Sequence, residues 1–251
     1  MSGIQALREL VARLRVDCPW DRAQTHQSLR AYLMEELYEV LDALDTADDG
    51  RIEEELGDLL FQVLLHARLG EERGAFDIDS VARRIHDKMV ERHPHVFADP
   101  SLPGGIADWE ARKAARGGSR VQGVPRAMPA LQRAHRVGEK VAHVGFDWPD
   151  IDGAWAKVEE EKRELLEAIA SADPARIRHE YGDLLLSVSS LGRFLGLSGE
   201  DALREANIRF ERRFRRVEAL AAEAGVGLEA AGLERLEGWW TVAKAEETRC
   251  A

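Results

Sequence analysis

The sequence predicts an all-α protein that consists of two tandem copies of one helical domain. Apolar residues recur at steps of three and four, which is the helical period, and no sustained alternating stretch bounded by hairpin turns appears. Residues 35–69 align without gaps with residues 160–194, and 16 of the 35 aligned positions are identical. A match of this length at one fixed offset indicates a duplicated structural unit.

A glycine-rich stretch between the two copies marks the expected domain boundary. It reads GGSRVQGVP over residues 117–125, and its glycines and proline suit an exposed linker better than a helix interior. We therefore expect an N-terminal domain over residues 1–116, a linker over residues 117–125 and a C-terminal domain over residues 126–251.

In the first copy, an amphipathic helix is expected near the N-terminus, followed by helices over residues 33–44, 52–68 and 80–92. The short turn over residues 45–50 makes the helices on its two sides antiparallel neighbours. The segment His93-Pro94-His95 then fits a helix end better than a metal site.

In the second copy, Asp173 before Pro174 is a strong helix start, because the acid can cap the helix and proline suits its first position. A later helix is expected over residues 199–224, opened by the capping pair Ser198 and Asp201.

Composition and charge exclude several classes of protein. A net charge of -11 disfavours a general binder of nucleic acid or of anionic membranes, because the field of the protein repels phosphate. Two cysteines form neither a disulfide framework nor a four-ligand zinc site. The longest apolar stretch is too short for a transmembrane helix. We expect a cytoplasmic protein that binds no nucleic acid and no membrane.

Paired acidic residues are the candidate metal ligands. Glu36 and Glu39 are three residues apart and project from one helix face, as do Glu55 and Asp58 on the next helix. Two carboxylates about 5.5 Å apart repel by ~3 kcal/mol at an effective dielectric of ~20, so four that converge need a cation. Ligation by oxygen alone favours Mg²⁺, with Mn²⁺ as a possible substitute. The second copy repeats the set at Glu161, Glu164, Glu180 and Asp183.

The competing interpretation is that these acids form a solvated surface. Their repetition in both copies argues against it, as does an interleaved apolar run, Leu56, Leu59, Leu60 and Val63, which predicts that this helix lies in a core. Glu35 and Glu160 could support the site from outside or simply be exposed. A second function class therefore stays open, namely a dimeric helical regulator without enzymatic activity.

Basic and aromatic residues follow each acidic set in the same order. Cations neutralise phosphates and an aromatic face stacks on a base, so acids for metal followed by these residues suit a nucleoside triphosphate. The first copy supplies Arg51, Lys88, Arg92, Trp109 and Lys113. The second copy supplies Arg176, Arg209, Arg213, Trp240 and Lys244.

Several short motifs together resemble the MazG family. They are CPWD over residues 18–21, EExxE over residues 35–39, ELGDLL over residues 55–60 and RHPHVF over residues 92–97, and the similarity continues through FERRF at residues 210–214 to Trp240. The resemblance implies tandem MazG-like domains, with four-helix-bundle cores completed by homodimerisation. It also implies Mg²⁺-dependent hydrolysis of nucleoside triphosphates (NTPs and dNTPs) to the monophosphate and pyrophosphate, as in housekeeping of the nucleotide pool.

Carried onto this sequence, the resemblance gives the two acidic sets the role of metal ligands. The acids of the second set are the expected catalytic residues, and the basic and aromatic residues of both copies are the expected substrate contacts. Arg176 and Arg209 stand where lysine is common in the family, and Lys162-Arg163 place charges inside the second EExxE. The preferred NTP, the number of metals, the general base and the number of active domains stay open at this stage.

Overall fold

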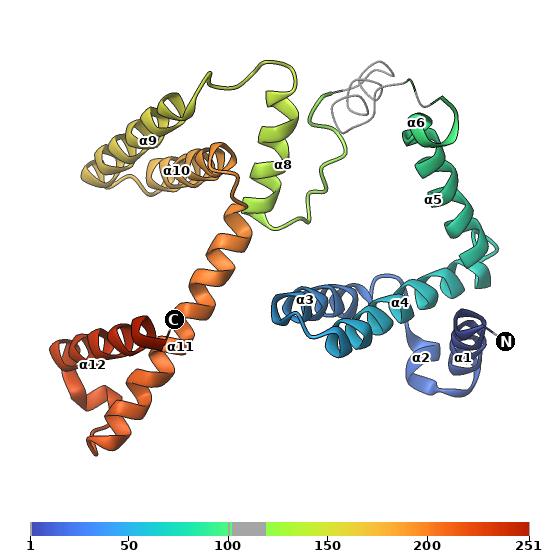
Figure 1. Ribbon diagram of the computed structural model, residues 1–251, viewed down its shortest axis with the longest axis horizontal. Helices are drawn as coiled ribbons and strands as arrows, with labels where there is room; N and C mark the ends of the chain where they lie inside the picture. Colours follow the sequence, from blue (N-terminus) through green and yellow to red (C-terminus); the bar gives the residue numbers. More distant parts are fainter. Residues whose placement is uncertain (1, 100, 102–118, 251) are drawn as a thin grey trace. The chain divides into compact units, whose positions relative to one another are not determined.

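The structure, a computed structural model, describes residues 2–99, 101 and 119–250 of the chain, with side chains up to residue 248 (Figure 1). Throughout this part of the chain the regular structure is helical and no strand occurs, which confirms the all-α prediction. The chain divides into two units, Met1–Trp109 and Glu110–Ala251. No helix in the described residues combines the length and the apolar character needed to span a membrane.

Unit 1 is built around the long helix α4. Its helices are α1 (Gly3–Asp17), α2 (Pro19–Ala23), α3 (Arg30–Thr46), α4 (Asp49–Glu72), α5 (Ile78–Arg92) and α6 (Pro94–Phe97). The core lies where α1 crosses the second half of α4, and its fully buried members include Val11, Leu29 and Leu65. The segment after residue 92 ends α5 as expected, although it then forms the short helix α6.

Unit 2 contains five described helices. They are α8 (Ala130–Ala142), α9 (Ile151–Ser171), α10 (Pro174–Phe194), α11 (Gly199–Glu223) and α12 (Leu228–Cys250). Helices α9 and α10 pack together, α8 lies against α10, and α11 pairs with α12 (Figure 1). Residues 119–129, which include most of the expected linker, form turns and irregular chain.

The pair α3–α4 in unit 1 and the pair α9–α10 in unit 2 are the two copies of the repeat. Ala43 and Ala168 occupy equivalent positions and are fully buried, so the small side chain lets each pair approach closely. Ala47 and Ala172 end the first helix of each pair with positive φ of 52° and 54°. The connection in the first copy is shorter than the expected turn over residues 45–50, because Asp48 caps α4 directly after Ala47. Asp173 caps α10 in the same way.

One expectation about the core is wrong. Leu56, Leu60 and Val63 were expected to be buried, but 49%, 36% and 38% of their surface is exposed. The core of unit 1 is made by the later part of α4, which includes Leu64, Leu65 and Leu69. Helix α4 also packs against α3, and within the described residues Leu56, Leu60 and Val63 stay partly exposed.

A pair of histidines joins the segment before α3 to helix α4. The Nδ1 atoms of His26 and His66 lie 2.7 Å apart in nearly coplanar rings, and Arg73 Nη2 lies 2.8 Å from His26 Nε2. Because arginine only donates, His26 Nε2 accepts and its Nδ1–H donates to His66 Nδ1. In this arrangement His66 Nδ1 carries no proton, so the His66 ring is neutral. Burial lowers the pKa of His66, and the neighbouring His26 lowers it further.

This histidine pair predicts an acid-sensitive contribution to stability. The folded pKa of His66 lies below its unfolded value, so the unfolded chain binds a proton first as the pH falls. The contribution is complete above about pH 6.5 and is lost as the pH falls toward the folded pKa. We expect the unfolding free energy from urea titrations at pH 7.5 and pH 5.5 to fall more for the wild type than for His66→Leu.

The His66→Leu variant introduces the residue that the second copy carries at the equivalent position, Leu191. The matched control is His86→Leu, because His86 is exposed on α5 and its side chain keeps 73% of its surface. Equal pH dependence in the wild type and His66→Leu would contradict the assignment of a neutral His66.

Candidate metal centres

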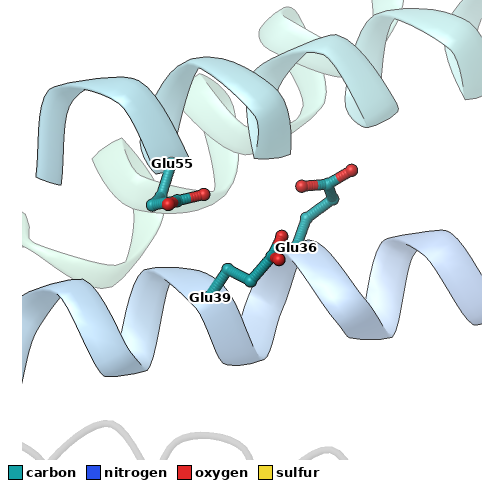
Figure 2. Close-up of side chains that lie close together, drawn as sticks. All are labelled: Glu36, Glu39 and Glu55. Atoms are coloured by element: carbon teal, nitrogen blue, oxygen red, sulfur yellow. The ribbon is translucent and has the colours of Figure 1, made fainter. Parts of the chain in front are cut away.

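In unit 1, three of the four predicted acids converge between α3 and α4. One carboxylate oxygen from each of Glu36, Glu39 and Glu55 lies within 4.8 Å of the others. Figure 2 shows Glu36 and Glu39 projecting from one helix toward Glu55 on its neighbour. The spacing of three residues within EExxE gives the two acids of α3 a common face, and the short connection after Ala47 brings α4 alongside.

The carboxylates of this cluster raise one another's pKa values. Partial desolvation raises the pKa of Glu39, and the charges of Glu36, Glu35 and Asp58 raise it further. The pKa of Glu55 is raised by desolvation and by Glu39, Glu54 and Asp58, while Arg51 acts weakly in the opposite direction. A bound cation would reverse these shifts, because it favours the ionised form of every ligand.

Gln62 supports this cluster from the same helix as Glu55. Its amide is buried, and Nε2 donates to Glu36 Oε1 over 3.3 Å. The amide oxygen is buried without a hydrogen-bond partner. The donor fixes Glu36 in the cluster, so Gln62 acts as a positioning residue that the sequence pattern did not single out.

In unit 2, the equivalent acids Glu161, Glu164 and Glu180 also bring one carboxylate oxygen each within 4.8 Å of one another. This cluster is less exposed, because Glu161 is buried at 5% relative exposure and the side chain of Glu180 keeps only 12%. Glu161 Oε2 is buried without a hydrogen-bond partner. A buried carboxylate oxygen left without a partner is a costly arrangement that a cation would relieve.

Two cations accompany the acids of unit 2. Lys157 Nζ lies 2.7 Å from Glu161 Oε1 and 2.9 Å from Glu160 Oε1, and these hydrogen bonds raise the pKa of the lysine. The same contact lowers the pKa of Glu160. Arg176 Nε lies 3.8 Å from Glu180 Oε1. Unit 2 therefore places two positively charged side chains beside its glutamates. A phosphate group could replace a glutamate as the ion-pair partner of either cation.

Lys157 was missed by the sequence analysis. It lies three and four residues before Glu160 and Glu161, which is the spacing of an ion pair on a helix. The equivalent residue of the first copy is Tyr32, so a search for matched pairs between the copies could not find it. The spacing of Lys157 from Glu160 and Glu161 along α9 is the sequence signal that could have identified it.

The fourth acid of each predicted set lies outside the group of three. Asp58 is exposed on α4, close enough for its charge to raise the pKa of Glu39 and Glu55. Asp183 is partly buried, and its Oδ2 lies 3.4 Å from His179 Nε2. The structure thus brings together three ligands per site and leaves each aspartate at the edge.

The basic residues expected in the first copy are spread over unit 1. Arg51 lies in the first turn of α4 and Lys88 on α5, and both are exposed, while Arg92 ends α5 and is partly buried. Trp109 and Lys113 lie outside the described residues. Among the three predicted contacts that the structure describes, Arg51 is the one whose charge lowers the pKa of Glu55.

The basic and aromatic residues expected in the second copy fall on α10, α11 and α12. Arg213 Nε lies 2.6 Å from Glu247 Oε2, and its guanidinium lies 6.0 Å from the ring centre of Trp240. Arg209 pairs with Glu205 at 3.6 Å, and Lys244 is exposed. These ion pairs lie within α11 and α12. Among the described residues, Arg176 is the one predicted cation of the second copy that contacts a glutamate of the cluster.

The donor set of both clusters fits a hard divalent cation. Each offers three carboxylates from two adjacent helices, and the buried oxygen of Glu161 lacks any other partner. Carboxylate oxygens are the ligands that Mg²⁺ and Mn²⁺ prefer, and three protein ligands leave positions for water or phosphate. Fold and site together describe an all-α protein with two carboxylate clusters, each of which could hold a divalent cation.

Comparison with known proteins assigns this class to a family. The MazG nucleotide pyrophosphohydrolase domain matches twice, over residues 24–97 and 153–217. The chain belongs to the MazG family, as its motifs predicted. It is 45% identical over 232 residues to the nucleoside triphosphate pyrophosphohydrolase/pyrophosphatase MazG of Thermotoga maritima, covering 90% of this chain and 89% of that one. It is 39% identical over 262 residues to the nucleoside triphosphate pyrophosphohydrolase of Escherichia coli K12, covering 98% and 99%.

Proposed function

We propose that this protein is a nucleoside triphosphate pyrophosphohydrolase, which converts an NTP or dNTP and water into the monophosphate and pyrophosphate. The observation that carries the proposal is the convergence of three glutamates from EExxE and ELGD-type segments in a chain of the MazG family. The names of the relatives from Thermotoga maritima and Escherichia coli support the same activity.

The proposed cofactor is Mg²⁺, with Mn²⁺ as a substitute. Glu161, Glu164 and Glu180 would hold it in unit 2, with Asp183 at the edge of the site. Glu36, Glu39, Glu55 and Asp58 form the corresponding set in unit 1. When bound, the ion neutralises the triphosphate and withdraws electrons from the α-phosphorus.

We assign the main catalytic site to unit 2 for three reasons. Glu161 is buried and has an unpartnered oxygen, Lys157 and Arg176 supply positive charge beside the glutamates, and a large cavity opens next to the cluster. A cavity of about 130 Å³ in unit 1, between α1, α4 and α5, has none of the predicted acids in its lining.

The proposed reaction is a displacement at the α-phosphorus. Water attacks, the bond from the α-phosphorus to the bridging oxygen breaks, and pyrophosphate leaves. One carboxylate of the cluster accepts the proton of the water, and Lys157 and Arg176 stabilise charge on the phosphate oxygens. This chemistry depends on position and charge neutralisation, so it needs no Ser, Cys or His nucleophile.

The proposed substrate contacts include the remaining predicted cations of unit 2, Arg209, Arg213 and Lys244, together with Trp240. Arg213 would have to exchange Glu247 for a phosphate, which a guanidinium does readily because both partners offer paired oxygens. We also propose that the protein acts as a homodimer, because apolar side chains stay exposed on the outer faces of α4 and α10.

Product analysis tests the proposed function. The protein with Mg²⁺ and each of several NTPs is expected to release pyrophosphate and the monophosphate in equal amounts, and chelation of the metal should stop the reaction. Release of orthophosphate and the diphosphate would refute the proposed bond cleavage. Absence of turnover with all NTPs and dNTPs would favour a helical regulator.

A further inference from the structure

A large cavity in unit 2 lies beside the glutamate cluster. It has a volume of about 640 Å³, is partly open, and is lined by residues of α8, α9, α10 and the loop between α8 and α9. This volume lies within the range of pockets that bind small organic ligands, about 300–1,000 Å³. The cavity is therefore large enough for much more than a phosphate group.

One part of the cavity lining is ionic and belongs to the proposed catalytic site. Lys157 and Glu161 contribute to it from α9, and Asp183 contributes from α10. The rest is mainly apolar and includes Val137, Val141 and Leu186. A ligand that fills this space has a charged part beside the acids and cations and an uncharged part against the apolar walls.

Two aromatic residues on the loop line the apolar part. Trp148 is fixed, because it packs against the core residues Ala154, Val158 and Leu191, and a side chain at Gly153 would collide with it. Phe146 keeps 78% of its surface exposed, which is the greatest exposure among the large hydrophobic residues described. An aromatic ring held open at a cavity is available to stack on a flat ligand.

The loop that carries both aromatic residues is held against α10 by a paired contact. Arg193 Nη1 and Nη2 donate to the two carboxylate oxygens of Asp147 over 2.8 and 2.9 Å, and these bonds lower the pKa of Asp147. Gly138 allows the contact, because a Cβ there would lie 2.6 Å from Arg193 Nε. The contact thus anchors the loop at Asp147, between Phe146 and Trp148.

We propose that this cavity binds the nucleoside part of the substrate, with Phe146 stacked on the base and the triphosphate directed toward Lys157 and Glu161. The inference rests on the proposed function, and it adds the residues that recognise the base. The cavity supplies what a nucleoside requires, namely apolar walls for the faces of a flat ring and a polar group, Ser190, for its edge. Because the walls are mainly apolar, we expect moderate discrimination among bases.

Binding of two ligands that differ only in the nucleoside tests the proposal. One is α,β-methylene-ATP, which resists cleavage at the reacting bond, and the other is inorganic tripolyphosphate, each titrated calorimetrically into the full chain with Mg²⁺. Phe146→Ala is expected to weaken the nucleotide about ten-fold, as expected for a lost base stack, and to leave tripolyphosphate unchanged. Phe146→Trp should restore nucleotide affinity to within about two-fold, because it keeps an aromatic face.

The matched control is Phe97→Ala, because Phe97 is also exposed, at 59%, and belongs to unit 1. It should change neither affinity. Unchanged nucleotide affinity in Phe146→Ala, or equal weakening of both ligands, would overturn the inference. A change in molecular mass in Phe146→Ala without loss of nucleotide affinity would also overturn it and would assign the cavity to contact with a second copy.

Turnover of the wild type separates this inference from the proposed function. If the wild type releases pyrophosphate from NTPs but Phe146→Ala binds nucleotide normally, only the inference fails. If the wild type neither binds nucleotide nor releases pyrophosphate, both fail.

Discussion

Replacing Glu180 by glutamine is expected to lower kcat for NTP hydrolysis by at least about 100-fold. Glu180 contributes one of the three carboxylates that converge in unit 2, and its side chain is nearly buried. Glutamine keeps the shape but removes the negative charge and one oxygen, so the metal is held more weakly. The folded structure should persist, since the substitution relieves repulsion among the acids. Steady-state kinetics with saturating Mg²⁺, combined with calorimetric Mn²⁺ binding, measure the effect.

The equivalent variant of the first copy, Glu55→Gln, is the matched control. Because we assign the main catalytic site to unit 2, Glu55→Gln should keep more than half of the wild-type kcat while losing Mn²⁺ binding in unit 1. Full activity in Glu180→Gln together with a large loss in Glu55→Gln would move the main site to unit 1. Full activity in both variants and unchanged Mn²⁺ binding would contradict the metal assignment altogether.

Charges placed on the exposed apolar stripes of α4 and α10 are expected to separate the proposed dimer. Leu56, Leu60 and Val63 share one face of α4, and the equivalent face of α10 carries Tyr181, Leu185 and Val188. Burying a leucine stabilises an interface by about 1.5–3 kcal/mol, whereas a buried unpaired carboxylate is strongly unfavourable. The double variant Leu60→Glu with Leu185→Glu should therefore lower self-association at least about ten-fold and reduce NTP turnover.

Val121→Glu is the control for this variant, because Val121 and Leu185 are equally exposed, at 41%, and Val121 lies in the linker region outside the helices. Light scattering over a concentration series gives the mass of each protein, and circular dichroism reports whether the helices persist. A wild type that is monomeric at all concentrations, or a double variant that keeps the wild-type dimer, would contradict the proposed assembly.

Helical periodicity and the repeat predicted the fold well, because both depend on local pattern. The helix pairs, the caps at Asp173 and Ser198, and the acids that meet across each pair follow from spacing along single helices. Helix ends were less accurate, as at the turn over residues 45–50, because capping by Asp48 extends α4 toward α3.

Burial and long-range contacts could not be predicted in the same way. An apolar run indicates that a helix packs against other groups, but it does not show which of its apolar side chains are buried, as the exposed stripe on α4 illustrates. The support of Glu36 by Gln62, the cavity beside Glu161, and the contact between Asp147 and Arg193 join residues far apart in the sequence or outside the repeated motifs. These features depend on how separate helices and loops pack together, and the spacing of residues within one helix does not predict that packing.

Hydrolysis of an NTP in water enriched with ¹⁸O shows whether water attacks the α-phosphorus. Mass spectrometry of the products locates the oxygen that came from the solvent. We expect one labelled oxygen in the nucleoside monophosphate and none in the pyrophosphate. Label in the pyrophosphate, or in orthophosphate released together with the diphosphate, would contradict that expectation.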